Sequence, residues 1–223
     1  MLRRFLRFCS IVVPVVVSIA MLVGMWRDHR EWLVLDAKIA KYESAIGRLD
    51  VTTESRMHLI YSDPGQPDRY QWRGHLPANQ SWRLSWRIAG KDADYTQVSS
   101  TNSEDFFPRV RIDDDGSEMS LHVLIVGKGM SQRIGAATAD LLRKYRDQLV
   151  IEVIAETETE DYPVDQIVSL LKIRLPESLR QDVVDQFGKF AWQVTDNGTL
   201  VHLRLGTDQA LEAEEKSEAE SDE

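Results

Sequence analysis

Residues 69–88 read RYQWRGHLPANQSWRLSWRI, and their alternation of apolar and polar side chains indicates a β-rich domain. Side chains of a strand point to opposite faces in turn, so each half of this stretch predicts a strand with an aromatic inner face. A short connection, Pro77 to Gln80, separates the two runs. We therefore predict an antiparallel hairpin. Its inner face would be formed by Tyr70, Trp72, Leu76, Trp82, Leu84, Trp86 and Ile88.

The outer face of this predicted hairpin is basic, and it carries Arg69, Arg73, Arg83 and Arg87. Guanidinium groups hold carboxylates and phosphates through paired hydrogen bonds, so four on one surface form a candidate anion-binding face. The alternative interpretation is a solvated strand face whose arginines pair with acidic neighbours. Both interpretations place the four side chains on one surface.

The period of two continues downstream. Residues 109–112 and 119–125 predict a second hairpin, joined by a type I′ turn in the Asp-Asp-Gly segment that ends at Gly116. Residues 149–155 predict a buried strand. Residues 190–195 and 200–205 flank Asn197-Gly198 and predict a third hairpin, because Asn-Gly is a strong signal for a two-residue turn.

Apolar stripes at helical spacing predict helices over residues 132–147 and 177–187. The segment from Pro163 to Leu171 is compatible with either a helix or a strand. Strand pairs with few helices predict a mainly β domain over residues 51–206, either a β-sandwich or an α+β domain with an antiparallel sheet.

An apolar run precedes this domain. Residues 8–26 read FCSIVVPVVVSIAMLVGMW, and as a helix they extend about 28 Å, which is enough to cross the hydrocarbon core of a bilayer. The run exceeds the usual length of a signal-peptide core, and bulky residues stand where cleavage requires small ones. We expect an uncleaved single-pass anchor, with a cleaved signal peptide as the alternative.

The orientation of the anchor follows from basic residues at its N-terminal end. The tail of residues 1–7 contains Arg3, Arg4 and Arg7. Positive charges near a membrane helix favour the cytoplasmic side, although Arg27, Arg30, Lys38 and Lys41 make the totals at the two ends similar. Because the charge is densest on the short tail, we expect a cytoplasmic N-terminus and an extracytoplasmic domain in the cell membrane.

Residues 27–50 have the spacing of an amphipathic helical stalk, and the apolar positions alternate at intervals of three and four. A seam of this kind is typical of a coiled coil and would join two chains in a parallel homodimer. A lone helix that packs on its own domain or continues the membrane helix is the alternative. The seam residues are Trp32, Leu35, Ile39, Tyr42, Ile46 and Leu49.

The net charge of −9 disfavours nucleic acid as a partner. Much of it is concentrated at the C-terminus, where residues 207–223 contain few apolar side chains and predict a disordered acidic tail.

The fifteen residues from Tyr70 to Leu84 (YQWRGHLPANQSWRL), behind an anchor and a helical stalk, resemble uncharacterised single-pass membrane proteins of planctomycete-type bacteria. The resemblance implies a bacterial origin and supplies no activity.

No residue pattern predicts a catalytic group, a cofactor or a metal site. Gly127-Lys-Gly129 lies between a predicted strand and a predicted helix, where backbone N–H groups can bind phosphate, but the remainder of a dinucleotide or Walker motif is missing. The sequence thus predicts a non-enzymatic interaction or scaffold module with an unknown protein partner. The alternative is an anchored receptor or enzyme for a small ligand or anion, using either Gly127–Gly129 or the four arginines.

Overall fold

The computed structural model describes Trp26, Arg30 and residues 48–221, apart from residues 92, 101–103, 126–127, 156–157, 194 and 196–197. The chain divides into two units, residues 1–45 and 46–223. In the first unit the guanidinium of Arg30 lies 4.4 Å from the centre of the Trp26 ring. The remainder of the predicted anchor and the stalk seam up to Ile46 lie outside the described residues. Within the described residues, no helix combines the length and the apolar character that a membrane span needs.

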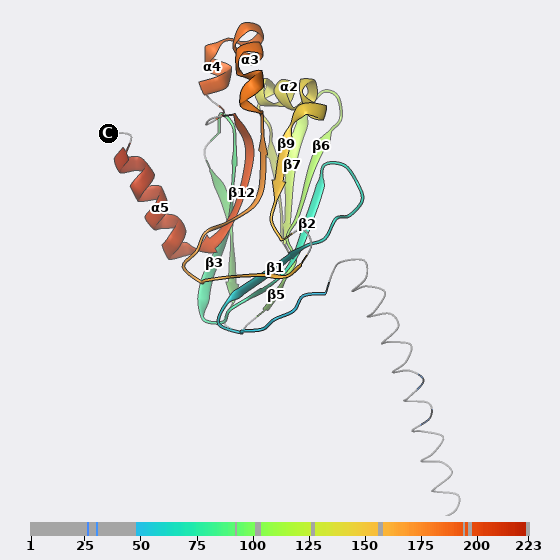
Figure 1. The fold of residues 1–223 in the computed structure, drawn as a ribbon, viewed down its shortest axis with the longest axis vertical. Helices are drawn as coiled ribbons and strands as arrows, with labels where there is room; N and C mark the ends of the chain where they lie inside the picture. The colour runs from blue at the N-terminus through green and yellow to red at the C-terminus, as the bar shows by residue number, and fades with distance from the viewer. Residues whose placement is uncertain are drawn as a thin grey trace, which may run out of the picture. The chain divides into compact units, whose positions relative to one another are not determined.

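The second unit is mainly β and contains two antiparallel sheets (Figure 1). The seven-stranded sheet has the order β10-β1-β2-β6-β7-β8, and β5 also pairs with β2. The five-stranded sheet has the order β4-β3-β12-β11-β9. The strands of the first sheet are β1 (Met57–Tyr61), β2 (Arg69–Leu76), β5 (Glu104–Phe106), β6 (Arg109–Asp114), β7 (Met119–Ile125), β8 (Lys128–Arg133) and β10 (Glu160–Tyr162). Those of the second are β3 (Gln80–Ile88), β4 (Asp94–Ser100), β9 (Val150–Val153), β11 (Val168–Arg174) and β12 (Thr199–Thr207).

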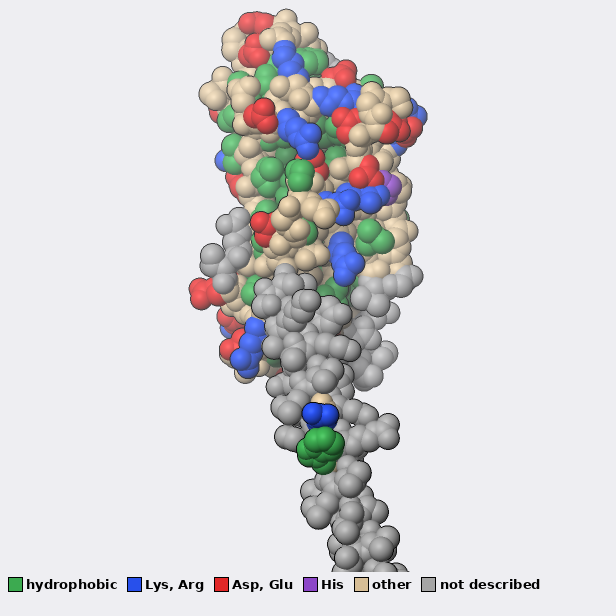
Figure 2. Space-filling view, turned by 90° about the vertical axis from the view of Figure 1, so that its right-hand side faces the viewer, with side chains coloured by type: hydrophobic (Ala, Val, Ile, Leu, Met, Phe, Trp, Pro, Cys, Tyr) green, Lys and Arg blue, Asp and Glu red, His purple; other side chains and the backbone are tan. Residues whose placement is uncertain are grey.

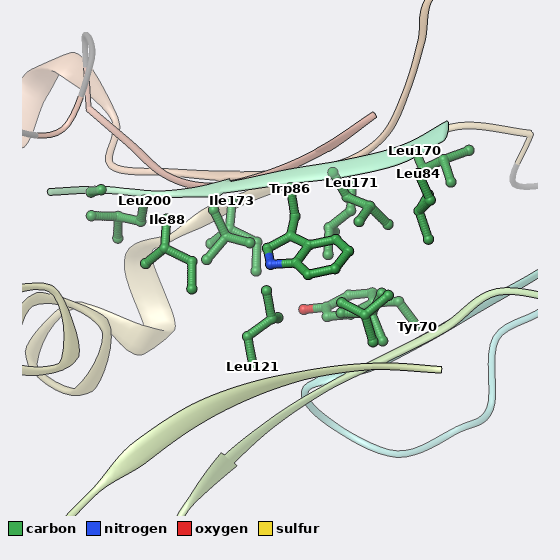
Figure 3. Close-up of a cluster of buried hydrophobic side chains, with 14 of the residues drawn as sticks. Tyr70, Leu84, Trp86, Ile88, Leu121, Leu170, Leu171, Ile173 and Leu200 are labelled. Carbon is green, nitrogen blue, oxygen red and sulfur yellow. The ribbon is translucent and has the colours of Figure 1, made fainter. Parts of the chain in front are cut away.

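The core lies between the two sheets. Trp86 of β3 reaches from the five-stranded sheet toward Tyr70 of β2 and Leu121 of β7, as Figure 3 shows. Trp86 is 1% exposed, and its indole Nε1 donates a hydrogen bond of 2.9 Å to Oε1 of Gln132 on β8. All seven inner-face residues predicted in the stretch 69–88 are buried. The mainly β prediction is confirmed, and the two facing sheets fit a β-sandwich.

The predicted hairpin between the two halves of residues 69–88 is wrong. Both strands exist, but β2 pairs with β1, β5 and β6, whereas β3 pairs with β4 and β12. The connection between them passes from one sheet to the other, with Asn79 at a φ of 59°. Two strands on opposite sides of one core show the same alternation as a hairpin, so the alternation does not distinguish the two arrangements.

The second predicted hairpin is confirmed as β6–β7, but its turn is longer than the predicted type I′ turn. Asp114 pairs with Met119, which leaves four residues, 115–118, in the loop. The Asp115 carboxylate accepts hydrogen bonds from the backbone N–H groups of Ser117 and Glu118, and Gly116 has a φ of 87°. The predicted strand at 149–155 is present as β9, but the prediction that it is buried is wrong, because β9 lies at the edge of its sheet and Ile151 is 46% exposed.

The hairpin predicted at Asn197-Gly198 is wrong. The segment before it forms helix α4 (Lys189–Gln193), and β12 pairs on its two sides with β3 and β11. Since both edges of β12 are occupied, residues 190–195 have no edge of β12 with which to pair. Gly198 instead joins the helical segment to β12, with a φ of 86°.

The remaining helices agree with the predicted ones in part. The helix predicted over 132–147 is shorter, α2 (Ala136–Lys144) followed by a 3₁₀ turn, η1 (Arg146–Gln148). The helix predicted over 177–187 is present as η2 (Glu177–Leu179) and α3 (Arg180–Phe187). The segment compatible with either structure is a turn followed by strand, since β11 begins only at Val168.

The disordered tail predicted at 207–223 is wrong, because residues 208–221 form helix α5 (Asp208–Ser221) beside the five-stranded sheet (Figure 1). Leu211 is completely buried, and acidic side chains of α5 pair with Arg83 and Arg204 of that sheet. The composition of the tail shows its charge, but the basic partners lie on strands distant in the sequence.

Candidate functional site

The four arginines predicted to share one surface are divided between two surfaces. Arg69 and Arg73 lie on the outer face of β2, in the seven-stranded sheet, and Arg83 and Arg87 lie on the outer face of β3, in the five-stranded sheet. The reason is the passage of the chain between sheets at residues 77–79. On each surface, neighbouring strands add further arginines that were not among the four predicted ones.

The first group forms the open arginine face, defined as Arg69, Arg73, Arg109 and Arg111. Arg69 on β2 stands directly opposite Arg111 on β6, and Gln71 stands opposite Arg109. Directly opposed residues on one face of an antiparallel pair have Cβ atoms about 5 Å apart, so Arg69 and Arg111 are neighbours of like charge. On β7, His122 lies opposite Arg111 and extends the row.

Carboxylates neutralise this face only in part. Asp113 pairs with Arg111 and also lies 3.3 Å from Nε2 of His122. Asp105 lies 3.4 Å from Nη2 of Arg73, whose guanidinium is 5.7 Å from the centre of the Phe107 ring. Among the described residues, Arg69 and Arg109 have no ion pair. The face therefore carries uncompensated positive charge in a protein of net charge −9.

A shallow hollow of about 370 Å³ adjoins the open arginine face. It is lined by Phe107, Arg109, Leu124 and Ile125. Leu124 lies opposite Arg109 and is 46% exposed, so an apolar side chain reaches the surface beside the arginines. Figure 2 shows one side of the molecule, on which Lys and Arg side chains lie among Asp and Glu side chains and hydrophobic side chains reach the surface between them.

The second group forms the covered arginine face, defined as Arg83, Arg87 and Arg204. Arg204 of β12 joins the two arginines of β3, because it lies opposite Ser85, between Arg83 and Arg87 on the same face. Arg83 and Arg204 are both buried. Helix α5 supplies the carboxylates that pair with them, so part of this face is occupied by the chain itself.

A cleft of about 440 Å³ lies between the β1–β2 loop and helix α2. Its apolar wall includes Tyr70, Ile112, Leu142 and Ile173, and its charged rim includes the ion pairs Arg143–Asp114 and Arg146–Asp68. Burial raises the pKa of Tyr70 to about 12, with a smaller contribution from Asp68. The volume is within the range of small-ligand sites, and sequence analysis did not predict this cleft.

Because of the Arg143–Asp114 ion pair, the stability of the domain should depend on pH in the acid range. Nε and Nη2 of Arg143 donate to the two Asp114 oxygens at 2.9 and 2.7 Å, and these bonds, with one from the backbone of Gly116, lower the pKa of Asp114 from 3.8 to about 2. A carboxyl group whose pKa is lower in the folded chain than in the unfolded chain stabilises the fold. This contribution is complete at pH values above the pKa of the unfolded chain, and it is lost as the pH falls through the pKa of the folded chain. We therefore expect D114N to lower the Tm at neutral pH, and this deficit relative to the native chain to shrink between about pH 4 and pH 2.

The control for this experiment is D140N, which removes a carboxylate that contacts the same guanidinium at 3.5 Å through a single oxygen. Thermal melts followed by circular dichroism should show a smaller deficit for D140N. A D114N deficit that stays constant across the acid range would contradict the assignment.

The phosphate-loop interpretation of Gly127–Gly129 is wrong. Strands β7 and β8 form a hairpin here, with Ile125 opposite Lys128 and Leu124 opposite Gly129. Helix α2 begins only at Ala136, so Gly129 lies inside a strand and not at the start of a helix. The segment KGMSQR is mostly polar, and its alternation was therefore too weak to predict β8.

The predicted self-association seam lies outside the described residues except for Leu49, and no contact tests it. Within the described part of the chain, no group of three or more His, Cys, Asp or Glu side chains is arranged to hold a metal ion.

The arginines that sequence analysis missed could be recognised in part. The run Arg109-Val-Arg111-Ile alternates in the same way as the selected strands, which indicates two more outward arginines. Their position beside Arg69 depends on the pairing of β2 with β6, which no local pattern shows.

Comparison with known proteins found no relative. The chain matches no protein-family model, no curated protein and no solved structure. The resemblance to planctomycete membrane proteins stays a prediction, and function is inferred from the surfaces of the domain.

Proposed function

We propose that this chain is a single-pass membrane protein, with a cytoplasmic N-terminus and an extracytoplasmic, non-enzymatic domain that binds an acidic protein partner through the open arginine face. The observation that carries the proposal is the placement of Arg69 directly opposite Arg111, with Arg109 beside them. Like charges directly opposite each other on a sheet are destabilising. Carboxylates of a partner would offset that repulsion through paired hydrogen bonds.

Apolar surface beside the arginines favours a protein partner over a simple polyanion. Leu124 and the hollow next to Phe107 and Arg109 can receive an apolar side chain. Arginine and aromatic residues are enriched at protein interfaces and frequently dominate their binding energy. A partner segment with acidic residues around one apolar anchor matches both parts of this surface.

The N-terminal segment supports the membrane part of the proposal. The apolar run of residues 8–26 and the basic residues before it favour an anchor with the domain outside. Confinement at a membrane raises the effective concentration of the domain near a partner in the same membrane. A stalk over 27–50 would support this role, and pairing through its seam would present two arginine faces side by side in a parallel dimer.

Photocrosslinking in cells tests the proposal. A photoreactive amino acid at Leu124 in the full, C-terminally tagged chain should crosslink to acidic peptides of one protein, identified by mass spectrometry. The yield should fall at least about tenfold when Arg109 and Arg111 are both replaced by Gln, since tenfold corresponds to only about 1.4 kcal/mol. Alkaline carbonate extraction of the same membranes should leave the chain in the pellet.

Gln181 provides the control, because it is exposed on α3 and is not among the described residues that line the hollow or the cleft. A photoreactive group there should not capture the same protein. The variant R180Q is the control for a general loss of positive charge, because it removes an exposed arginine on α3, away from the open arginine face. Equal capture from both positions, or capture that is unaffected by loss of Arg109 and Arg111, would show that the open arginine face is not the binding surface.

A further inference from the structure

The covered arginine face holds the chain's own helix α5 through one side of that helix. Asp208, Leu211, Glu212 and Glu215 are spaced at i, i+3, i+4 and i+7, so they share one helical face. Three of these residues are acidic and contact the same arginine of β3. Attachment of α5 therefore combines a set of charges with a single apolar side chain.

Arg83 is the centre of the charged contact. Its Nε donates to Oδ1 of Asp208 at 3.0 Å, its Nη2 lies 3.4 Å from Oε1 of Glu212, and its Nη1 lies 3.8 Å from Oε1 of Glu215. The guanidinium also lies 4.3 Å from the centre of the Tyr95 ring. The side chain is 9% exposed, so these contacts are screened much less than pairs on an open surface.

Leu211 is the apolar anchor, and the sheet has a matching notch. Gly206 of β12 lies opposite Arg83, and a Cβ atom there would lie 3.4 Å from Cγ of Leu211 and 3.2 Å from Cγ1 of Ile167. The absence of a side chain at Gly206 therefore leaves the space that Leu211 fills. Leu211 is fully buried, whereas Glu212 and Glu215 beside it are exposed.

Arg204 shows that α5 does not use all of the donors on this face. Its side chain is more than nine-tenths buried and pairs with Glu214 through Nη1. Its Nη2 is also buried and has no hydrogen-bond partner within the described part of the chain. A buried guanidinium N–H without an acceptor is costly, so a helix that placed another carboxylate here would bind more tightly than α5 does.

From these contacts we infer that the outer face of the five-stranded sheet is a docking surface for acidic helices with a leucine anchor, and that α5 occupies it until a partner helix of the same kind replaces it. The contact set is mainly polar, so exchange requires the release of one buried leucine, the ion pairs of Arg83 and Arg204, and the hydrogen bonds from Ser81 and Gln97 to Asp208. This surface lies on a different sheet from the open arginine face, and the inference does not depend on that face binding a partner.

The test uses a fluorescent synthetic peptide of residues 208–221, DQALEAEEKSEAES, as the probe. It is added to the full chain and to a chain that ends at Thr207, both with Arg109 and Arg111 replaced by Gln so that the open arginine face does not contribute. Fluorescence anisotropy should show saturable binding to the shortened chain, at least about tenfold weaker binding to the full chain, and weaker binding as salt is added.

Two changes identify the surface. R83Q in the shortened chain should reduce peptide affinity at least about tenfold, and a peptide with aspartate at the position of Leu211 should bind no better than a scrambled peptide. R174Q is the control, because Arg174 pairs with Glu152 near the other edge of the same sheet. Equal binding to the native and R83Q forms would overturn the inference.

If the shortened chain does not fold, the full chain with E212Q and E215Q decides the question. These changes weaken the hold of α5 on Arg83 and leave Asp208 and Leu211 in place. The variant should bind the native peptide more tightly than the unchanged full chain does, and it should lose this gain when R83Q is added. Peptide binding that is no stronger than in the unchanged chain would overturn the inference.

Discussion

Replacement of Trp86 by alanine should lower the free energy of unfolding by about 3–5 kcal/mol, the range measured when large buried aromatic side chains are truncated. Trp86 is fully enclosed between the sheets, close to Tyr70 and Leu121 of the opposite sheet (Figure 3). Truncation would leave a cavity whose lining loses its contacts. It would also remove the hydrogen bond from Nε1 to Gln132, which links β3 with β8 in the opposite sheet.

Urea unfolding followed by circular dichroism measures this loss. W86F is the matched variant, since it keeps most of the apolar volume while removing the indole donor, and it should lose clearly less stability than W86A. I151A at the exposed edge strand should cost about 1 kcal/mol or less, because Ile151 is 46% exposed in the folded chain and only part of its side chain is removed from water. A loss below about 1.5 kcal/mol for W86A would contradict the central role given to this residue.

Replacement of Gly198 by alanine should cost about 2–4 kcal/mol, from backbone strain and steric overlap together. Gly198 has a φ of 86°, which side-chain-bearing residues rarely adopt. A Cβ atom there would lie 2.9 Å from the carbonyl oxygen of Leu175 and 3.1 Å from Cη2 of Trp192. The Gly198 carbonyl also accepts a hydrogen bond of 2.8 Å from the backbone N–H of Leu175, so a shift of the backbone would disturb that bond.

G116A separates the two causes. Gly116 has nearly the same φ, 87°, but no atom lies within 4 Å of a Cβ built on it. It should therefore show the cost of backbone strain alone, about 1–2 kcal/mol. The difference between the two variants in thermal and urea unfolding gives the steric part at Gly198. Equal losses would show that the contact with Leu175 and Trp192 adjusts without cost.

The strands and the core could be predicted because alternation is a local property. Trp82, Leu84, Trp86 and Ile88 appear at every second position, and each is buried. Pairing is not set by local pattern, since β3 pairs on one side with β4, which follows it in the chain, and on the other with β12, more than a hundred residues later. The same stretch therefore gave the correct strand and a wrong hairpin. For the same reason, Arg69 and Arg73 were recognised as outward-facing without Arg109 and Arg111 as their neighbours.

Helix α5 shows a different limit of the sequence. An acidic composition predicts that an isolated segment stays disordered in water, whereas its structure in the folded chain depends on the residues that it contacts. Arg83 and Arg204 provide opposite charge, and Gly206 provides space for Leu211, from positions that no property of residues 208–221 reveals. A polar strand such as β8 is missed for a related reason, since its pairing with β7 and not its own pattern determines its structure.

The central position of β12 has a consequence for the time at which the domain folds. β12 is the last strand along the described chain, yet it lies in the middle of its sheet, with β3 on one side and β11 on the other. While the chain is being synthesised, β3–β4 and β9–β11 can each pair, but no strand connects the two pairs until residue 207 has been made. The five-stranded sheet therefore cannot close until β12 has been synthesised, and the exposed edges of β3 and β11 need protection during that interval.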